Sequence, residues 1–283
     1  MSAQLLQRRR ALAWLASSAG ATLLATGCGG GGDASSSTSS STSTSTTTTG
    51  TTTTTTGSTS TTSTTTCVAD PAETAGPYPA DGTNTSSGAT SDILTASGVV
   101  RSDIRSSFLS STTVAQGVAM SITLTLANTN ASCAVLSGYA VYLWHCDRAG
   151  NYSLYTAPTE SYLRGVQVSD SLGQVTFTTI FPACYAGRYP HMHFEVFASL
   201  ASATTGRNAL LTSQLALPAD VCNAVFQNAT GYSQSVTNFA QVSLATDGVF
   251  GDNTAAQIAA MTPSMLGSVS AGYTATATIG LAR

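Results

Sequence analysis

The chain has 283 residues, of which 10 are basic and 13 acidic, and it carries a formal net charge of −3. All of the basic residues are arginines, and this slightly acidic balance excludes the basic surface that nucleic-acid binding requires. The first quarter of the sequence lacks the pattern of a packed core, and the length that remains suits one domain of the larger all-β kind.

Residues 1–28 have the pattern of an export signal. Three consecutive arginines at 8–10 precede an apolar run at 11–25, which is too short for a spanning helix and predicts a signal peptide. The arginines resemble a twin-arginine signal, whose pathway exports folded proteins, and Cys28 resembles the lipidated cysteine of a bacterial lipoprotein. We expect a periplasmic or cell-surface protein that meets the membrane only through a lipid at Cys28. The alternative is cleavage by ordinary signal peptidase and free release.

Residues 29–66 are almost entirely glycine, serine and threonine. Such a segment has too few apolar side chains to offset the entropy lost on ordering, which predicts a flexible tether. The folded domain is therefore expected at 67–283, in an oxidising compartment where disulfides persist.

The segment 67–283 has the pattern of an all-β domain. Apolar residues alternate with serine and threonine from Met120 to Leu126, which is the period of a half-buried strand. Similar runs occupy 138–146, 174–181 and 273–281, separated by turn residues. One short helix is expected after Pro218. The pattern predicts an antiparallel β-sandwich with short helical segments and long loops.

The motif with the clearest chemistry is His191-Met192-His193, which holds two of the chain's 3 histidines. Residues i and i+2 of a strand point to the same face, so both imidazoles can converge on one metal ion. Met192, Phe194 and Val196 would then face the apolar side. An exposed pair of histidines on a surface strand is the alternative.

Other motifs precede or surround this pair in a fixed order. They are Glu73-Thr74-Ala75-Gly76-Pro77-Tyr78, Arg101-Ser102-Asp103-Ile104-Arg105, Trp144-His145-Cys146-Asp147 with Gly150 and Tyr152, Tyr162-Leu163-Arg164-Gly165, and Phe177-Thr178-Thr179-Ile180-Phe181-Pro182 leading to Tyr185 and Arg188. Together they resemble the intradiol ring-cleavage dioxygenases, the family of the catechol and protocatechuate dioxygenases, from about Cys67 to the C-terminus.

The resemblance implies an iron(III) site whose ligands are Tyr152, Tyr185, His191 and His193. Anionic phenolate oxygens suit a hard ferric ion, and imidazole suits iron as well. Tyrosine normally titrates near pH 10, so only a nearby strong cation would keep two phenols ionised. Ordinary core packing is the alternative for both tyrosines.

The resemblance also assigns catalytic roles. Arg188 would stabilise negative charge that develops on the substrate ring, Tyr185 would be the tyrosinate that the substrate displaces, and Gln214 would lie near the same pocket. Salt-bridge and ordinary strand roles are the alternatives for Arg188 and Gln214. Gly76 and Pro77 would line the pocket mouth or form a simple turn, and His145 is interpreted as structural.

The reaction that the resemblance implies is cleavage of a catechol-type diol by dioxygen to a muconate-type diacid, without an organic cofactor. One rival is a surface β-sandwich binding module that keeps the fold without turnover. A second is a copper or zinc protein that uses His191, His193 and a cysteine such as Cys184. Cys184 also stands where many relatives have a bulkier residue. The ring substituents and the oligomeric state do not follow from the sequence.

Five cysteines beyond Cys28 permit two disulfides and one free thiol. Spacing does not determine the pairing. We favour Cys133 with Cys146 and Cys67 with Cys222, because the fifth, Cys184, lies beside the expected metal ligands.

Overall fold

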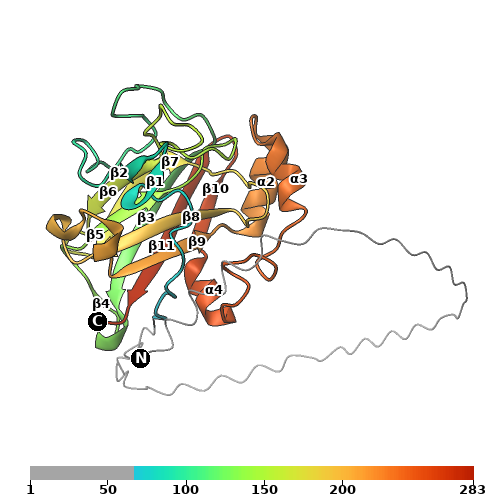
Figure 1. Cartoon of the computed structure of the whole chain (residues 1–283). Helices are drawn as coiled ribbons and strands as arrows, with labels where there is room; N and C mark the ends of the chain where they lie inside the picture. The colour runs from blue at the N-terminus through green and yellow to red at the C-terminus, as the bar shows by residue number, and fades with distance from the viewer. Residues whose placement is uncertain (1–66) are drawn as a thin grey trace, which may run out of the picture. The chain divides into compact units, whose positions relative to one another are not determined.

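The structure is a computed structural model in which residues 67–283 are described, so the predicted signal peptide at 1–28 and tether at 29–66 lie outside the described residues. Two β-sheets dominate the described part (Figure 1). A separate hairpin is formed by β1 (Asp81–Ser86) and β2 (Ala89–Asp92). The strands of the two sheets are β3 (Ala119–Asn128), β4 (Ala134–Val135), β5 (Ala140–Trp144), β6 (Arg164–Val168), β7 (Gln174–Ile180), β8 (His191–Phe197), β9 (Leu211–Ala216), β10 (Ser264–Ser268) and β11 (Gly272–Leu281).

The first sheet has five strands in the order β10-β11-β3-β4, with β7 paired to β3. Most of its pairs are antiparallel, as expected, but β11 runs parallel to β3, with Tyr273 level with Met120 and Leu281 level with Asn128. A parallel pair requires a long crossover between its strands. The chain supplies it here, because β11 is reached only after all of the second sheet and the helices.

The second sheet has four antiparallel strands in the order β6-β5-β8-β9. One of its faces packs against the first sheet to form the core, to which β3 contributes Ile122 and Leu124 and β8 contributes Phe194. Met192 and Val196 lie in the same core, so the predicted apolar side of the histidine strand is confirmed. This arrangement of two packed sheets confirms the predicted β-sandwich.

The other face of the second sheet is covered by loops rather than by a sheet. The aromatic side chains of Tyr142 and Trp144 on this face pack with Ile93 and Leu94 from the hairpin region and with Tyr152 from the loop after β5. Pairing places Trp144, His193 and Gln214 side by side in one row across β5, β8 and β9. Polar groups of this row are thereby buried beneath the loops.

The described part has three short α-helices, of which two lie side by side and the third lies beside β9 and β11 (Figure 1). The predicted helix is α2 (Ala219–Asn228), which begins after Pro218 and buries Val221, Val225 and Phe226 on one face. The helices α3 (Ser233–Phe239) and α4 (Ala255–Met261) were not predicted. Each buries a single residue, so neither has an apolar stripe that a sequence pattern could reveal. Three short 3₁₀ turns occur at Thr129–Ala131, Leu200–Ser202 and Gly206–Asn208.

The disulfide pairing that we favoured is wrong. Cys67 is bonded to Cys133, whereas Cys146, Cys184 and Cys222 are buried free thiols. The cause is the path of the first described residues, because the backbone N–H of Asp70 donates to the carbonyl of Gly280 at the end of β11, which lies beside the end of β3. The fold thus brings the first described residue close to the turn after β3.

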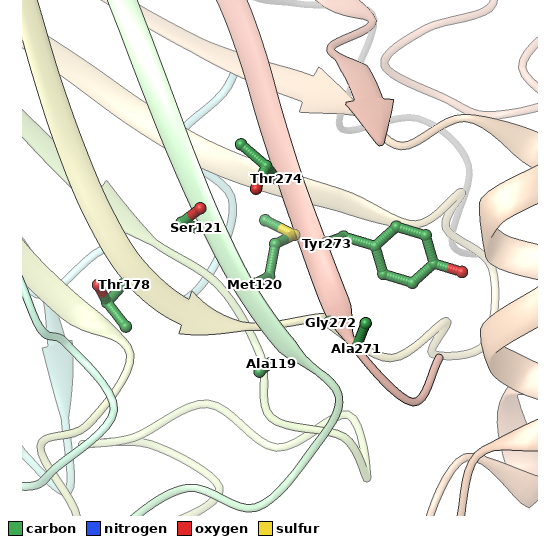
Figure 2. A pocket seen from close by; sticks show the side chains of 8 residues that line it. All are labelled: Ala119, Met120, Ser121, Thr178, Ala271, Gly272, Tyr273 and Thr274. Atoms are coloured by element: carbon green, nitrogen blue, oxygen red, sulfur yellow. The ribbon is translucent and has the colours of Figure 1, made fainter. Parts of the chain in front are cut away.

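No helix within residues 67–283 is long and apolar enough to cross a membrane. A hollow of about 260 Å³ lies on the outer face of the five-stranded sheet, where Ser121, Thr178 and Thr274 occupy one register row near Tyr273 (Figure 2). It is lined by hydroxyls and small side chains and lies on the sheet that does not carry the histidine pair, so it is separate from the site described next.

Candidate metal centre

The two histidines of β8 meet at their Nε2 atoms. His191 and His193 are 2% exposed, and their Nε2 atoms lie 3.1 Å apart. Imidazole nitrogens bind a metal ion at about 2.0–2.1 Å, so two nitrogens that share one ion are expected to lie about 3 Å apart. The distance between the two Nε2 atoms fits joint ligation.

A backbone carbonyl fixes the orientation of the first ring. Nδ1 of His191 lies 2.5 Å from the carbonyl oxygen of Tyr189, a contact that only a protonated Nδ1 can make. The Nε2 lone pair of His191 therefore faces the hydroxyl of Tyr185, which lies 3.1 Å away. Metal-binding histidines are commonly oriented in this way by a carbonyl.

The second ring is held by stacking. His193 lies nearly parallel to Trp144, with ring centroids 4.9 Å apart and an interplanar angle of 7°. Its Nδ1 is buried and has no hydrogen-bond partner among the described residues. A Cβ added to Gly76 would approach Cε1 of His193 to 3.2 Å, so this glycine allows the loop before β1 to lie close to the ring.

The two predicted tyrosines come from different loops. Tyr152 follows β5 and Tyr185 precedes β8, and their ring centroids lie 5.9 Å apart in an edge-on arrangement. The centroid of Tyr152 also lies 6.1 Å from that of His193. Tyr152 is 1% exposed and Tyr185 only partly buried, so the two phenols differ in access to solvent.

The hydroxyl of Tyr152 is buried without a hydrogen-bond partner among the described residues. Burial raises the pKa of Tyr152 well above its usual value, and the nearby phenol of Tyr185 raises it further, although the two hydroxyls do not have the geometry of a hydrogen bond. Burial likewise raises the pKa of Tyr185 to about 12, although Arg188 opposes the rise. A buried polar group of this kind is costly unless something binds it.

Burial has the opposite consequence for the two imidazoles. It lowers the pKa of His191 to about 3, with a contribution from the charge of Arg188, and it lowers the pKa of His193 well below its usual range. Both rings are therefore neutral at pH 7, which is the form that ligates a metal.

These donors fit a ferric ion. Two neutral imidazoles, one partnerless phenol and one phenol that touches an imidazole nitrogen occupy one buried region, and a bound cation would favour ionisation of both phenols. Among residues 67–283 no group of three or more His, Cys, Asp and Glu side chains is placed to hold a metal ion. Cys184 therefore does not complete a site with the two histidines, and its Sγ instead contacts the carbonyl oxygen of Arg188.

Arg188 and Gln214 lie at the edge of the same site. NH1 of Arg188 lies 3.4 Å from Nε2 of His191, and NH2 donates to Oε1 of Gln214 at 2.6 Å. Gln214 donates through Nε2 to the carbonyl oxygen of Thr74 at 2.8 Å. Gln214 therefore connects the arginine to the loop that carries Gly76.

Two residues of the predicted motifs, His145 and Arg164, have structural roles. His145 is turned away from the site, because Nδ1 contacts the carbonyl of Cys146 at 2.7 Å and Nε2 contacts the hydroxyl of Thr179 at 2.7 Å. Arg164 is fully buried and donates to Tyr142, to Ser153 and to the carbonyls of Tyr78 and Pro79. It joins the loop before β1 to the loop that carries Tyr152.

One charged residue at the site was missed from the sequence. Asp247, in the segment between α3 and α4, accepts from Nε of Arg188 at 2.9 Å. It lies 59 positions from its partner, in no motif and in no periodic element, so no sequence signal pairs the two residues.

The fold of the described residues is similar to that of solved dioxygenase structures. The structure is similar to the intradiol ring-cleavage dioxygenase from Tetranychus urticae, with a TM-score of 0.57 and 22% identity over 76% of this chain and 95% of that one. A second dioxygenase structure gives a TM-score of 0.56 at 22% identity, covering 76% of this chain and 94% of that one. At this identity the similarity establishes the intradiol dioxygenase fold. No family model and no protein of curated function matches the sequence.

Proposed function

We propose that the protein is an iron(III)-dependent dioxygenase that cleaves a catechol-type ring between its two hydroxylated carbons and yields a muconate-type diacid. The observation that carries the proposal is the meeting of two neutral imidazoles with two phenols, of which Tyr152 is buried without a hydrogen-bond partner among residues 67–283, on an intradiol dioxygenase fold. Small aromatic diols and dioxygen are the proposed substrates.

In this proposal Tyr152, Tyr185, His191 and His193 hold the ion. The chemistry that iron(III) supplies when bound is Lewis-acid activation of the diol, so that the electron-rich ring reacts with dioxygen. His191 keeps its lone pair toward the site because Tyr189 holds its Nδ1 proton. His193 is kept in place by the stack on Trp144.

Tyr152 and Tyr185 have different roles in this proposal. Tyr152 is almost completely buried in the loop after β5 and would hold the ion from a position that solvent does not reach. Tyr185 is more accessible to solvent, so its phenolic oxygen would be the group that accepts a proton from an incoming diol. Because burial raises the pKa of Tyr185 to about 12, its phenol would hold that proton at neutral pH.

Arg188 supplies fixed positive charge beside the ring. Its NH1 lies near Nε2 of His191, and a preorganised cation in a buried site stabilises negative charge more than one in water. Gln214 accepts a hydrogen bond from the guanidinium and donates one to the carbonyl oxygen of Thr74, so it fixes the guanidinium relative to this loop. Arg188 thus stabilises the anionic diol, and Gln214 orients Arg188.

We further propose that this domain acts outside the cytoplasm, attached through a lipid at Cys28 after twin-arginine export. The support is the sequence of residues 1–28 together with the Cys67–Cys133 disulfide, which is typical of oxidising compartments. Radiolabelled palmitate incorporation by the wild-type chain and its loss in Cys28→Ala would test the anchor.

The test of the activity uses the purified protein. We expect one iron per chain, a visible phenolate-to-iron(III) charge-transfer band, and oxygen uptake with members of a catechol panel. A colourless protein that binds zinc or no metal would contradict the iron site. Iron and colour without oxygen uptake on any diol would instead identify a β-sandwich binding module.

A further inference from the structure

Asp247 is a buried carboxylate with an unusually full set of donors. It is 2% exposed, and besides Arg188 it accepts from the backbone N–H groups of Tyr189 at 2.6 Å, Val249 at 2.8 Å and Phe250 at 3.1 Å. Burial alone would raise its pKa, but the charge of Arg188 and these hydrogen bonds outweigh it, so the pKa of Asp247 is lowered. The group is an anion at neutral pH and is fixed in one orientation.

The guanidinium of Arg188 is held on two sides. Nε donates to Oδ2 of Asp247 at 2.9 Å and NH2 contacts Oδ1 at 3.4 Å, while NH2 also donates to Gln214 at 2.6 Å. NH1 is the remaining edge, and it points to Nε2 of His191. The arginine side chain is 17% exposed, so without these partners it would have room for other rotamers.

The same carboxylate also braces the backbone that orients His191. Oδ2 of Asp247 accepts from the N–H of Tyr189, and the carbonyl of Tyr189 receives Nδ1 of His191. One side chain from the α3–α4 segment therefore connects to both the arginine and the histidine that face the site.

We propose that Asp247 is a positioning residue that fixes Arg188 with its NH1 edge toward the substrate and thereby sets the affinity of the site for an anionic diol. The inference rests on the proposed function and adds to it a residue outside every motif. Asp247 does not touch the substrate and acts through Arg188.

The test compares Asp247→Asn with the matched control Asp252→Asn, which changes an exposed carboxylate of the same segment. Asparagine keeps one oxygen for Val249 and Phe250, but the oxygen that accepts from Nε of Arg188 and from the N–H of Tyr189 becomes an N–H₂ group, which cannot accept. We expect Asp247→Asn to retain iron and the visible band, since no ligand is lost. The affinity for 4-nitrocatechol in optical titration and kcat/KM for catechol should fall about 10- to 100-fold, the usual effect of losing a supporting partner. Asp252→Asn should match the wild type.

A double-variant experiment separates positioning from general stability. If Asp247 acts through Arg188, then Asp247→Asn adds no further loss of analogue affinity in an Arg188→Met background. A further loss of the same size in that background, or wild-type affinity of Asp247→Asn alone, would overturn the inference.

Two further measurements test the role of Asp247 without relying on turnover. In NMR spectra of the metal-free wild type, the Nε–H proton of Arg188 should exchange slowly with solvent. In Asp247→Asn the same proton should exchange fast, and this expectation does not depend on enzymatic activity. Unchanged exchange would overturn the inference.

Should Asp247→Asn not fold, Arg188→Lys replaces it, because lysine keeps the charge but cannot donate to Asp247 and Gln214 at the same time. Wild-type analogue affinity of Arg188→Lys would overturn the positioning role. Absence of iron and turnover in the wild type would overturn the proposed function instead.

Discussion

Tyr152 is the residue whose environment most depends on a bound ion. Its hydroxyl is buried and has no partner within residues 67–283, and leaving such a group unsatisfied costs about 1–3 kcal/mol. We therefore predict that Tyr152→Phe leaves the metal-free protein as stable as the wild type or stabilises it by about 1 kcal/mol. Iron content and the visible band should both fall. Thermal unfolding of the metal-free proteins and absorption spectra after iron loading measure the two effects.

Tyr155→Phe is the matched control, because Tyr155 lies three residues on in the same loop and its hydroxyl has two partners. It donates to Oδ1 of Asn84 at 2.6 Å and accepts from the N–H of Ala80 at 2.9 Å. Its loss should destabilise the protein by about 1–2 kcal/mol and leave the band in place. An unchanged spectrum in Tyr152→Phe would remove Tyr152 from the ligand set.

At the scale of elements, the histidine strand was predictable and the charge cluster around it was not. Strand periodicity alone places His191 and His193 on one face and Phe194 in the core, and the structure has both. Arg188 and Asp247 meet because two loops far apart in the sequence are folded against each other. Loops have no period, so their contacts follow from tertiary packing only.

Helix α4 illustrates a local signal that was available. Thr254 and Gln257 form a capping box, in which each side chain satisfies a backbone N–H of the first turn, and this spacing is visible in the sequence. Helix α3 has no such cap and buries only Ser235. Its existence depends on packing beside α2 and on contacts such as the bond from Asn238 to the Cys184 carbonyl.

The loop before β1 lies so close to His193 that one added methyl group would displace this ring. Gly76 has a φ of +69°, and an added Cβ would lie 3.2 Å from Cε1 of His193. We predict that Gly76→Ala lowers stability by about 1 kcal/mol through its backbone conformation and also displaces His193, so that iron affinity and activity fall at least tenfold. Iron binding and oxygen uptake measure the second effect.

Gly88→Ala separates the two contributions. Gly88 has a φ of +82°, yet an added Cβ would meet nothing within 4 Å. This variant should show the same backbone cost with wild-type iron affinity. Equal iron affinities for the two alanine variants would mean that the loop yields to the methyl group and that Gly76 has no special contact with the ring.

At the scale of the whole described part, the disulfide joins the segment at Cys67 to the turn after β3. Cys67 and Cys133 are 66 positions apart, and cross-linking a loop of this length stabilises a protein by roughly 4 kcal/mol in the chain-entropy view. We predict that a reductant lowers the Tm by roughly 10 °C, given about 2–4 °C per kcal/mol at this size. Calorimetry with and without reductant measures the shift. The double variant Cys67→Ser/Cys133→Ser should melt at the lower temperature in both conditions, and a reductant effect in that variant would implicate other thiols.

Asp70 makes the stability of the whole sandwich depend on pH. Its carboxyl accepts from the N–H of Gly280 at 2.7 Å, and burial raises its pKa from 3.8 to about 7. In the unfolded chain the carboxyl ionises near pH 4, whereas in the folded protein it stays protonated until about pH 7. Its contribution to the free energy of unfolding is therefore complete below pH 4 and is lost as the pH rises to 7.

A rise in pKa from 3.8 to about 7 corresponds to roughly 4 kcal/mol. Asp70→Asn keeps an oxygen for Gly280 and does not titrate. We predict that the wild type, measured relative to Asp70→Asn by urea unfolding, loses roughly 4 kcal/mol of stability between pH 4 and pH 7. The difference should persist in 1 M salt, because burial rather than a surface charge causes it. A pH-independent difference would show that water reaches this carboxyl, and the contact between the segment at Asp70 and β11 would then be looser than a buried pair requires.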